Sequence, residues 1–400
     1  MQSKSKNKIV VLAFQLCVIA NSVFGSDAQL YKLSKAVMLA FFVVMIGAIL
    51  FRGYKLRAGK QLALPFAFAI YILASVMWSY NQDVATTWLV TVLQLVVLLI
   101  FSYLAMMDGA EVKDYLDALY ISGWGLAAFA LVRYGGLENY LKIMEDGMRM
   151  GGEIANENNF GLTFSSAAIS AAYYLIIRKR KIDIVSIAVF AFFTLSSGSK
   201  KATLLIIAGI FAIAFVRFGI KKIYKTVLLG AVVLVAAWFV LQLPIFETVY
   251  SRLESFFSGE LDVSDTARKN MITVGLNLFW DRPILGYGLY NYSEFYPTGQ
   301  YSHNNFVELL VCGGVVGFVL YYIMYATALG TMFSCKAKGE KLSEQHLMLL
   351  VWLVIDLIFG YGMVQIYEKT SFILLGVAMG VTDRDHIRLA QNRVLRGERK

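Results

Sequence analysis

The chain has 400 residues, of which 58% are hydrophobic and only 16% are charged, and its formal net charge is +10 at pH 7. A soluble domain carries about a quarter charged residues, so this composition excludes an ordinary soluble globular protein. The apolar residues come in runs of roughly 17–22, the length of a helix that crosses a bilayer core. Segments such as 226–243 are apolar on every face, which excludes the alternating strands of a membrane β-barrel. The predicted fold class is therefore all-α and polytopic.

Twelve apolar segments follow one another along the chain, and each is predicted to be a transmembrane helix. They cover 9–24, 34–51, 61–79, 86–106, 115–132, 159–177, 182–197, 202–217, 226–243, 304–333, 347–364 and 371–382. The first run follows Lys4, Lys6 and Lys8 but has no clear small-x-small cleavage site. It is therefore interpreted as the first span and not as a signal peptide.

The connections between these spans alternate in positive charge. One set holds about 25 of the 37 Lys and Arg residues and the other set only about 12. The basic set comprises the N-terminus, Arg52/Lys55/Arg57/Lys60, Lys113, 178–181, Arg217/Lys221/Lys222/Lys225, Lys336/Lys338/Lys341 and the tail 383–400. Because Lys and Arg are enriched in cytoplasmic connections, this set and both termini are predicted to be cytoplasmic. The net charge of +10 is then explained by the cytoplasmic connections, which set the orientation in the membrane and face anionic lipid headgroups. It does not indicate nucleic-acid binding.

This topology divides the chain into four parts. Spans one to nine occupy 1–243, an outer polar segment occupies 244–303, spans ten to twelve occupy 304–382, and a basic cytoplasmic tail occupies 383–400. Outer connections are usually short and poor in Lys and Arg. The outer segment is long and contains Arg252, Arg268, Lys269, Arg282 and His303. We therefore expect the chemistry of the protein to lie there.

Two helices and a turn are predicted within the outer segment. Apolar residues at helical spacing indicate an amphipathic helix on the membrane surface: Ile245, Val249, Leu253, Phe256 and Phe257. Asp262 and Ser264 are candidate caps of a second helix over about 265–280. The stretch 284–288 contains two glycines and predicts a tight turn that comes close to a neighbouring segment. The aromatic and amide side chains of 290–301 suit either sugar binding or an aromatic belt at the membrane interface.

Three short motifs occur in a fixed order. Ser-Gly-Ser-Lys-Lys-Ala spans 197–202, Trp-Asp-Arg-Pro-Ile-Leu-Gly-Tyr-Gly spans 280–288 after Arg268, and His303-Asn304 precedes Gly314-x-x-Gly317. Over about 195–330 this set resembles the O-antigen ligase and O-antigen polymerase superfamily. The resemblance implies a GT-C-like, multi-pass enzyme of the bacterial cytoplasmic (inner) membrane, with its active site on the outer, periplasmic face. Such enzymes move glycans between undecaprenyl-diphosphate carriers or onto lipid A-core.

The resemblance also implies roles for individual residues. His303 matches a helix-start histidine taken to be the catalytic base, and Arg268 matches an arginine taken to contact the carrier diphosphate. Lys200 stands where the family often has arginine, and lysine keeps the charge but cannot form the bidentate fork to phosphate. Cys312 stands nine residues after the histidine, where many relatives have an acid. If that acid matters, Glu308 would have to substitute for it.

These roles suit the chemistry of transfer from a lipid diphosphate. A neutral imidazole can take the proton of an acceptor hydroxyl near neutral pH, and a guanidinium can chelate phosphate oxygens. Arg149 and Arg252 are expected to add positive charge, and the further substrate-binding candidates are Asn304, Tyr287 and Asn291. Three scattered Cys and three scattered His give no metal-ligand spacing. No metal and no cofactor are therefore expected.

Simpler readings of the same residues stay open. His303 could be a hydrogen-bonded interface residue, and Lys200 could extend to lipid headgroups. Arg149 could form a local ion pair with Glu145 or Asp146. Gly313, Gly314 and Gly317 are expected to allow close helix packing.

The first functional hypothesis is a polymerase that joins lipid-linked oligosaccharide repeats into O-antigen or capsular or exopolysaccharide. The alternative is the ligase that transfers the finished polymer to lipid A-core. A lipid-linked oligosaccharide flippase or transporter is a third reading, which the scarcity of ionisable residues inside the spans disfavours. The expected partners are an undecaprenyl-diphosphate-linked glycan donor, a glycan acceptor and membrane lipids, with a chain-length regulator as a further candidate and no nucleic acid.

Overall fold

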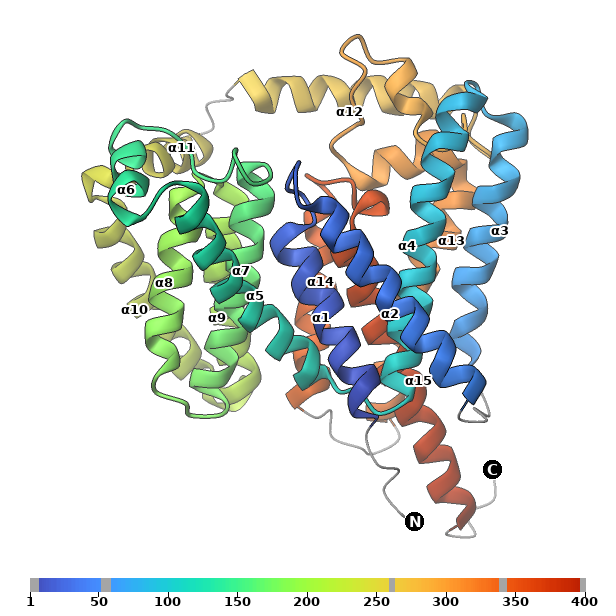
Figure 1. The fold of residues 1–400 in the computed structure, drawn as a ribbon, viewed down its shortest axis with the longest axis horizontal. Coiled ribbons are helices and arrows are strands. Elements are labelled where there is room, and N and C mark those ends of the chain that lie inside the picture. Colours follow the sequence, from blue (N-terminus) through green and yellow to red (C-terminus); the bar gives the residue numbers. More distant parts are fainter. Residues whose placement is uncertain (1–6, 52–58, 259–262, 338–343, 396–400) are drawn as a thin grey trace. The chain divides into compact units, whose positions relative to one another are not determined.

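A computed structural model describes the chain except for residues 1–6, 52–58, 259–262, 338–343 and 396–400 (Figure 1). The part so described consists of helices and their connections, with no strand. It forms two compact units. Unit 1 comprises Met1–Val11, Phe42–Val112 and Leu261–Lys400, and unit 2 comprises Leu12–Phe41 and Lys113–Glu260. Outside the described residues lie Lys4, Lys6, Arg52, Lys55, Arg57, the predicted cap Asp262, Lys338, Lys341 and the end of the basic tail.

A helix occupies all or most of each of the twelve predicted spans, and the helix in the predicted span 347–364 ends early, at Phe359. These helices are α1 (Lys8–Phe24), α2 (Tyr31–Phe51), α3 (Ala63–Ser75), α4 (Gln82–Met107), α5 (Val112–Arg133), α7 (Glu157–Ile176), α8 (Asp183–Ser196), α9 (Lys200–Phe218), α10 (Ile223–Leu241), α13 (Asn305–Ala337), α14 (Glu344–Phe359) and α15 (Lys369–Leu395). Within the described ranges, seven helices are long and apolar enough to cross a membrane: α2, α3 with its flanking turns, α4, α5, α9, α10 with the turn before it, and α13. A multi-pass helical membrane protein is therefore confirmed, and the count of twelve spans stays a prediction. The helix α15 continues beyond the predicted span to Leu395, so the first part of the predicted tail is helical.

Three further helices lie outside the predicted spans, namely α6 (Leu137–Glu145), α11 (Glu247–Ser258) and α12 (Val263–Asp281). The helix α11 agrees with the first predicted surface helix, and its Val249 and Leu253 are buried in unit 2. The helix α12 starts at Val263, so the predicted cap Ser264 lies inside it. Within unit 1, α12 lies across the end of the bundle at which α13 begins (Figure 1).

The predicted tight turn 284–288, together with Pro283 before it, pairs with α13 at a break in that helix. Four backbone hydrogen bonds join the two segments: Tyr287 N to Val311 O at 2.8 Å, Gly288 N to Cys312 O at 2.9 Å, Val315 N to Pro283 O at 2.8 Å, and Val316 N to Ile284 O at 3.3 Å. The broken helix thus finds partners for carbonyl and amide groups that an unbroken helix would satisfy internally. Two of the three sequence motifs therefore form one structural unit.

Glycine is required on both sides of this junction. Gly314 has φ 57° and ψ −166°, a backbone conformation open almost only to glycine. A Cβ atom on Gly314 would lie 2.2 Å from the carbonyl oxygen of Ile284, and one on Gly286 would lie 2.5 Å from that of Val311. The prediction of helix packing was therefore wrong for Gly314, which breaks the helix, whereas Gly317 does pack closely against Tyr71 of α3.

Candidate active site

The predicted catalytic histidine lies immediately before α13. Asn304 caps this helix, because its Oδ1 accepts hydrogen bonds from the backbone N–H groups of Phe306 at 3.0 Å and Val307 at 3.1 Å. His303 is half-buried and has φ 54°, a left-handed conformation that is uncommon for residues other than glycine. Strained residues of this kind cluster at functional sites. The ring of His303 lies 4.5 Å from the ring of Tyr301, measured between centroids.

Arg268 of α12 acts on the same tyrosine. Burial raises the pKa of the Tyr301 hydroxyl, the carboxylates of Glu368 and Glu308 raise it further, and the Arg268 guanidinium lowers it. A charge has such an influence only at short range, because solvent screens distant charges. His303 thus packs against Tyr301, and the positive charge of Arg268 acts on the hydroxyl of the same tyrosine.

Glu308 is an acid that binds the residue before the histidine, and the sequence analysis named it only as a substitute for Cys312. It is fully buried in the first part of α13. Its Oε2 accepts a hydrogen bond from the backbone N–H of Ser302 at 2.8 Å, and its Oε1 accepts one from the Tyr367 hydroxyl at 3.2 Å. The Cys312 thiol lies 3.6 Å from the same Oε1. An acid inside an apolar span is by itself a signal of function, and this signal could have identified Glu308.

Three aromatic side chains form a cluster beside this carboxylate, and sequence reasoning identified none of them individually. Trp88 of α4 and Tyr290 stack with their ring centroids 3.9 Å apart and an interplanar angle of 11°. The ring of Tyr367 lies 4.9 Å from Trp88 and 5.2 Å from Tyr290. Burial raises the pKa of Tyr290 to about 12, and the charge of Glu308 contributes to this increase. We call Trp88, Tyr290 and Tyr367 the aromatic cluster.

Two predicted substrate-binding residues have structural contacts in the same unit. Asn291 is fully buried, and its Oδ1 accepts a hydrogen bond from the backbone N–H of Asn81 at 2.6 Å. Its Nδ2 donates to the carbonyl oxygen of Leu289 at 3.0 Å. Tyr287 is buried beneath the Arg282 guanidinium, which lies 4.6 Å from the ring centroid. These contacts hold the loop after α12, and a role in substrate binding stays a prediction for both residues.

The other predicted cations lie in unit 2. Arg149 donates from Nε to the carbonyl oxygen of Ser197 at 2.9 Å, and its guanidinium lies 3.9 Å from Glu157. Arg149 therefore lies beside an acid at the start of α7, and the ion pair with Glu145 or Asp146 stays a prediction. Lys200 begins α9 next to the same turn, and its ammonium lies 5.7 Å from the ring centroid of Phe256 on α11.

Arg252 lies four residues before Phe256 on α11, so the two side chains share one face of that helix. The Nε atom of Arg252 is buried and has no hydrogen-bond partner among the described residues. The structure therefore brings Lys200 close to Arg149 at the turn and to the face of α11 that carries Arg252. We call Arg149, Lys200 and Arg252 the cation group of unit 2.

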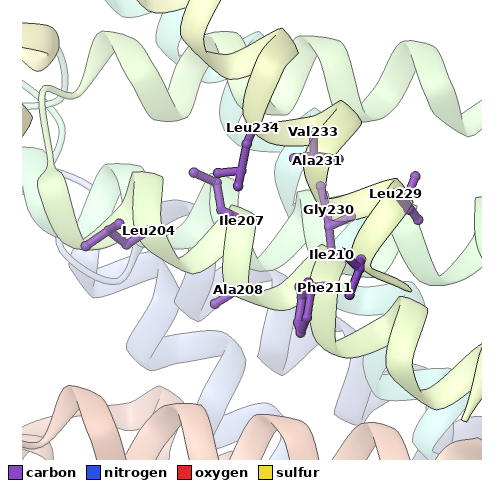
Figure 2. A pocket seen from close by; sticks show the side chains of 11 residues that line it. Leu204, Ile207, Ala208, Ile210, Phe211, Leu229, Gly230, Ala231, Val233 and Leu234 are labelled. Carbon is purple, nitrogen blue, oxygen red and sulfur yellow. The ribbon is translucent and has the colours of Figure 1, made fainter. Parts of the chain in front are cut away.

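An apolar groove lies between α9 and α10 (Figure 2). Its volume is about 550 Å³. Eleven residues line it, all of them apolar or glycine: Leu204, Ile207, Ala208, Ile210, Phe211, Val227, Leu229, Gly230, Ala231, Val233 and Leu234. Leu204 lies one helical turn after Lys200, so one end of the groove is close to a positive charge.

The described residues contain no group of three or more His, Cys, Asp or Glu side chains that could hold a metal ion. The site in unit 1 instead offers an imidazole, a guanidinium, a buried carboxylate and aromatic rings. Such a set can take up a proton, bind an anion and contact a sugar ring.

Comparison with known families finds a match for part of the chain. A family model described as O-antigen ligase matches residues 184–322. No curated protein matches the chain. The matched region runs from α8 into α13 and includes Lys200, Arg252, Arg268, Tyr287, Asn291, His303 and Asn304, whereas Arg149 lies before it. The predicted resemblance to the O-antigen ligase and polymerase superfamily is therefore confirmed over this region.

Proposed function

Since residues 184–322 match the O-antigen ligase family, we propose that this protein is an integral-membrane glycosyltransferase of the bacterial cytoplasmic membrane. It polymerises undecaprenyl-diphosphate-linked oligosaccharide repeats into a surface polysaccharide, with its active site on the outer face and both termini in the cytoplasm. The observation that supports this proposal is the place of His303 before α13, with its ring 4.5 Å from that of Tyr301, inside the region that matches the family.

The proposed reaction is a single transfer between two lipid-linked glycans. The acceptor hydroxyl oxygen attacks the anomeric carbon of the donor, and the bond between that carbon and the diphosphate oxygen breaks. The hydroxyl proton passes to the imidazole of His303, and the carrier leaves as its diphosphate. Arg268 contacts the phosphate oxygens and stabilises the negative charge that develops on the leaving group. The aromatic cluster offers ring faces to the acceptor sugar.

The carrier itself has both a charged and an apolar part. We assign its isoprenoid chain to the groove between α9 and α10, because the groove is lined only by apolar residues and glycine. The cation group of unit 2 supplies positive charge near the Lys200 end of the groove, which suits an anionic headgroup. Within unit 2 the two features thus match the two parts of an amphipathic lipid.

Purified protein in detergent, incubated with lipid-linked repeat units, tests the proposal directly. We expect products longer by whole repeats, formed equally well in EDTA. Absence of transfer by protein that is folded and monodisperse would contradict it, and loss of transfer in EDTA would contradict the expected independence from metal.

Transfer of the finished polymer to lipid A-core is the second candidate, because the matching family model is described as O-antigen ligase. A lipopolysaccharide gel of a deletion strain in a Gram-negative host separates the two. Loss of a polymerase leaves core plus one repeat. Loss of a ligase leaves bare core while long polymer accumulates on the carrier.

A further inference from the structure

The loop that carries His303 is tethered by one buried carboxylate. Glu308 is fully buried, and its two oxygens hold different segments of unit 1. Oε2 accepts from the backbone N–H of Ser302, the residue before His303, and Oε1 accepts from Tyr367 in the turn before α15. A buried carboxylate is costly unless hydrogen bonds satisfy it, so both bonds matter for the stability of this arrangement.

The loop has a second set of bonds on the other side of the histidine. The Ser302 hydroxyl donates to the carbonyl oxygen of Asn304 at 2.8 Å, and Asn304 Nδ2 donates to the carbonyl oxygen of Tyr361 at 3.2 Å. His303 lies between these anchored neighbours in a left-handed conformation with φ 54°. Such a conformation persists only where the surroundings impose it.

From these contacts we propose that Glu308 is a positioning residue for His303. It fixes the backbone before the imidazole and, through Tyr367, ties that backbone to the aromatic cluster. This assignment rests on the proposed function only for the statement that His303 is the base.

Chemical modification of the histidines tests the tether without any assay of glycan transfer. Diethyl pyrocarbonate modifies accessible imidazoles, and mass spectrometry reports His303, His346 and His386 separately. In Glu308→Ala we expect His303 to react several-fold faster than in the wild type, while His346 and His386 on α14 and α15 keep their rates. Glu308→Gln retains an acceptor for Ser302 and is expected to give a rate between those of the wild type and Glu308→Ala.

Leu309→Ala is the matched control, because Leu309 is the next residue of α13, is 2% exposed and contributes packing without a side-chain hydrogen bond. It should leave the rate at His303 unchanged. An unchanged rate at His303 in Glu308→Ala, or an equal change at all three histidines, would overturn the proposal.

An activity measurement separates this inference from the proposed function. If both hold, Glu308→Ala lowers kcat for glycan transfer and leaves KM nearly unchanged, because substrate contacts remain. If the wild type transfers no glycan, the proposed function fails while the modification rates still decide the role of Glu308. If the wild type is active and Glu308→Ala has the same kcat, Glu308 does not position the base.

Discussion

The rings of Tyr301 and His303 lie 4.5 Å apart, and the hydroxyl of Tyr301 is within the electrostatic reach of Arg268. One tyrosine thus links a loop at the start of α13 to the side of α12. The imidazole belongs to the loop before α13 and the guanidinium to α12, and each is the subject of one of the following predictions.

Replacement of His303 by Ala or Gln should remove the general base. General-base assistance contributes about 10²–10⁴-fold, so transfer should fall by that factor without vanishing. The chain-length distribution of the polysaccharide, measured at equal protein level, gives the readout. His346→Ala serves as the control, since His346 pairs with Asp385 on α15. A normal distribution in His303→Ala would refute the enzyme hypothesis and favour a transporter.

Arg268→Lys should not be conservative. Lysine keeps the positive charge but loses the planar fork that binds two phosphate oxygens at once. Loss of one charged hydrogen bond costs about 1.5–3 kcal/mol, which corresponds to a decrease of roughly 10- to 100-fold in kcat/KM. Lys269→Ala is the matched control, because Lys269 is the exposed neighbour of Arg268 on α12. Full activity of Arg268→Lys would reject bidentate phosphate binding at this position.

Gly314→Ala should destabilise the protein. The added Cβ would meet the carbonyl oxygen of Ile284 at 2.2 Å, and φ at this position is 57°. Backbone strain of this kind alone costs about 1–3 kcal/mol. Gly330→Ala on the same helix is the matched control, because a Cβ there meets nothing within 4 Å, and alanine should stabilise by up to about 1 kcal/mol. Thermal unfolding in detergent measures both, and equal Tm values for the two variants would argue against the break at Gly314.

The free energy of unfolding should decrease as the pH rises from about 4.5 to about 7, because Glu368 loses its proton in this range. Burial raises the pKa of this carboxyl from its ordinary value of 4.5 to about 7. Between these two values the native state holds a proton that the unfolded chain has released, so raising the pH favours unfolding. Glu368→Gln should therefore flatten the dependence of Tm on pH between about 4.5 and 7. Exposed Glu294→Gln should not, and parallel curves for wild type and Glu368→Gln would show that Glu368 is not the responsible group.

Filling the groove between α9 and α10 should select against long carriers. Ala208 is exposed and lines the groove, so Ala208→Trp should place an indole where we assign the isoprenoid chain. Transfer from a donor with the full undecaprenyl chain should decrease more than transfer from one with a short isoprenoid. Val235→Trp is the control, because Val235 is 55% exposed on α10 and does not line the groove. An equal effect of the two variants would place the chain elsewhere.

The helices could be predicted from the sequence because each corresponds to one long, continuous run of apolar residues. The cap at Asn304 lies beside the predicted start of span ten, where an asparagine followed by an apolar run favours a helix start. The break at Gly314 could not be predicted in the same way, since the apolar run continues through it and the compensating segment 283–288 is non-local. Hydropathy reports how well a residue suits lipid and carries no information about which distant backbone will replace a missing helical hydrogen bond.

The sequence analysis identified the site residues that belong to recognisable motifs. It did not identify the residues that only the tertiary structure brings to the site. His303 and Arg268 belong to short motifs, so the resemblance could identify them. Trp88 and Tyr367 lie about 200 residues before and about 60 residues after the histidine, and each looks like an interface aromatic on its own. Glu308 could have been identified, because a lone acid in an apolar span requires partners.

The interrupted helix α13 has a consequence for biosynthesis. The ribosome makes the stretch 283–288 before it makes 311–316, so the earlier stretch must await its partner. If 283–288 is not yet paired with α13, the carbonyl groups of Val311 and Cys312 enter the bilayer without these hydrogen-bond donors. Hydrocarbon contains no donors that could replace them. Insertion of α13 and folding of the segment before it are therefore one cooperative event. In a chain truncated before 311, the stretch 283–288 would lack the backbone partners that it has in α13.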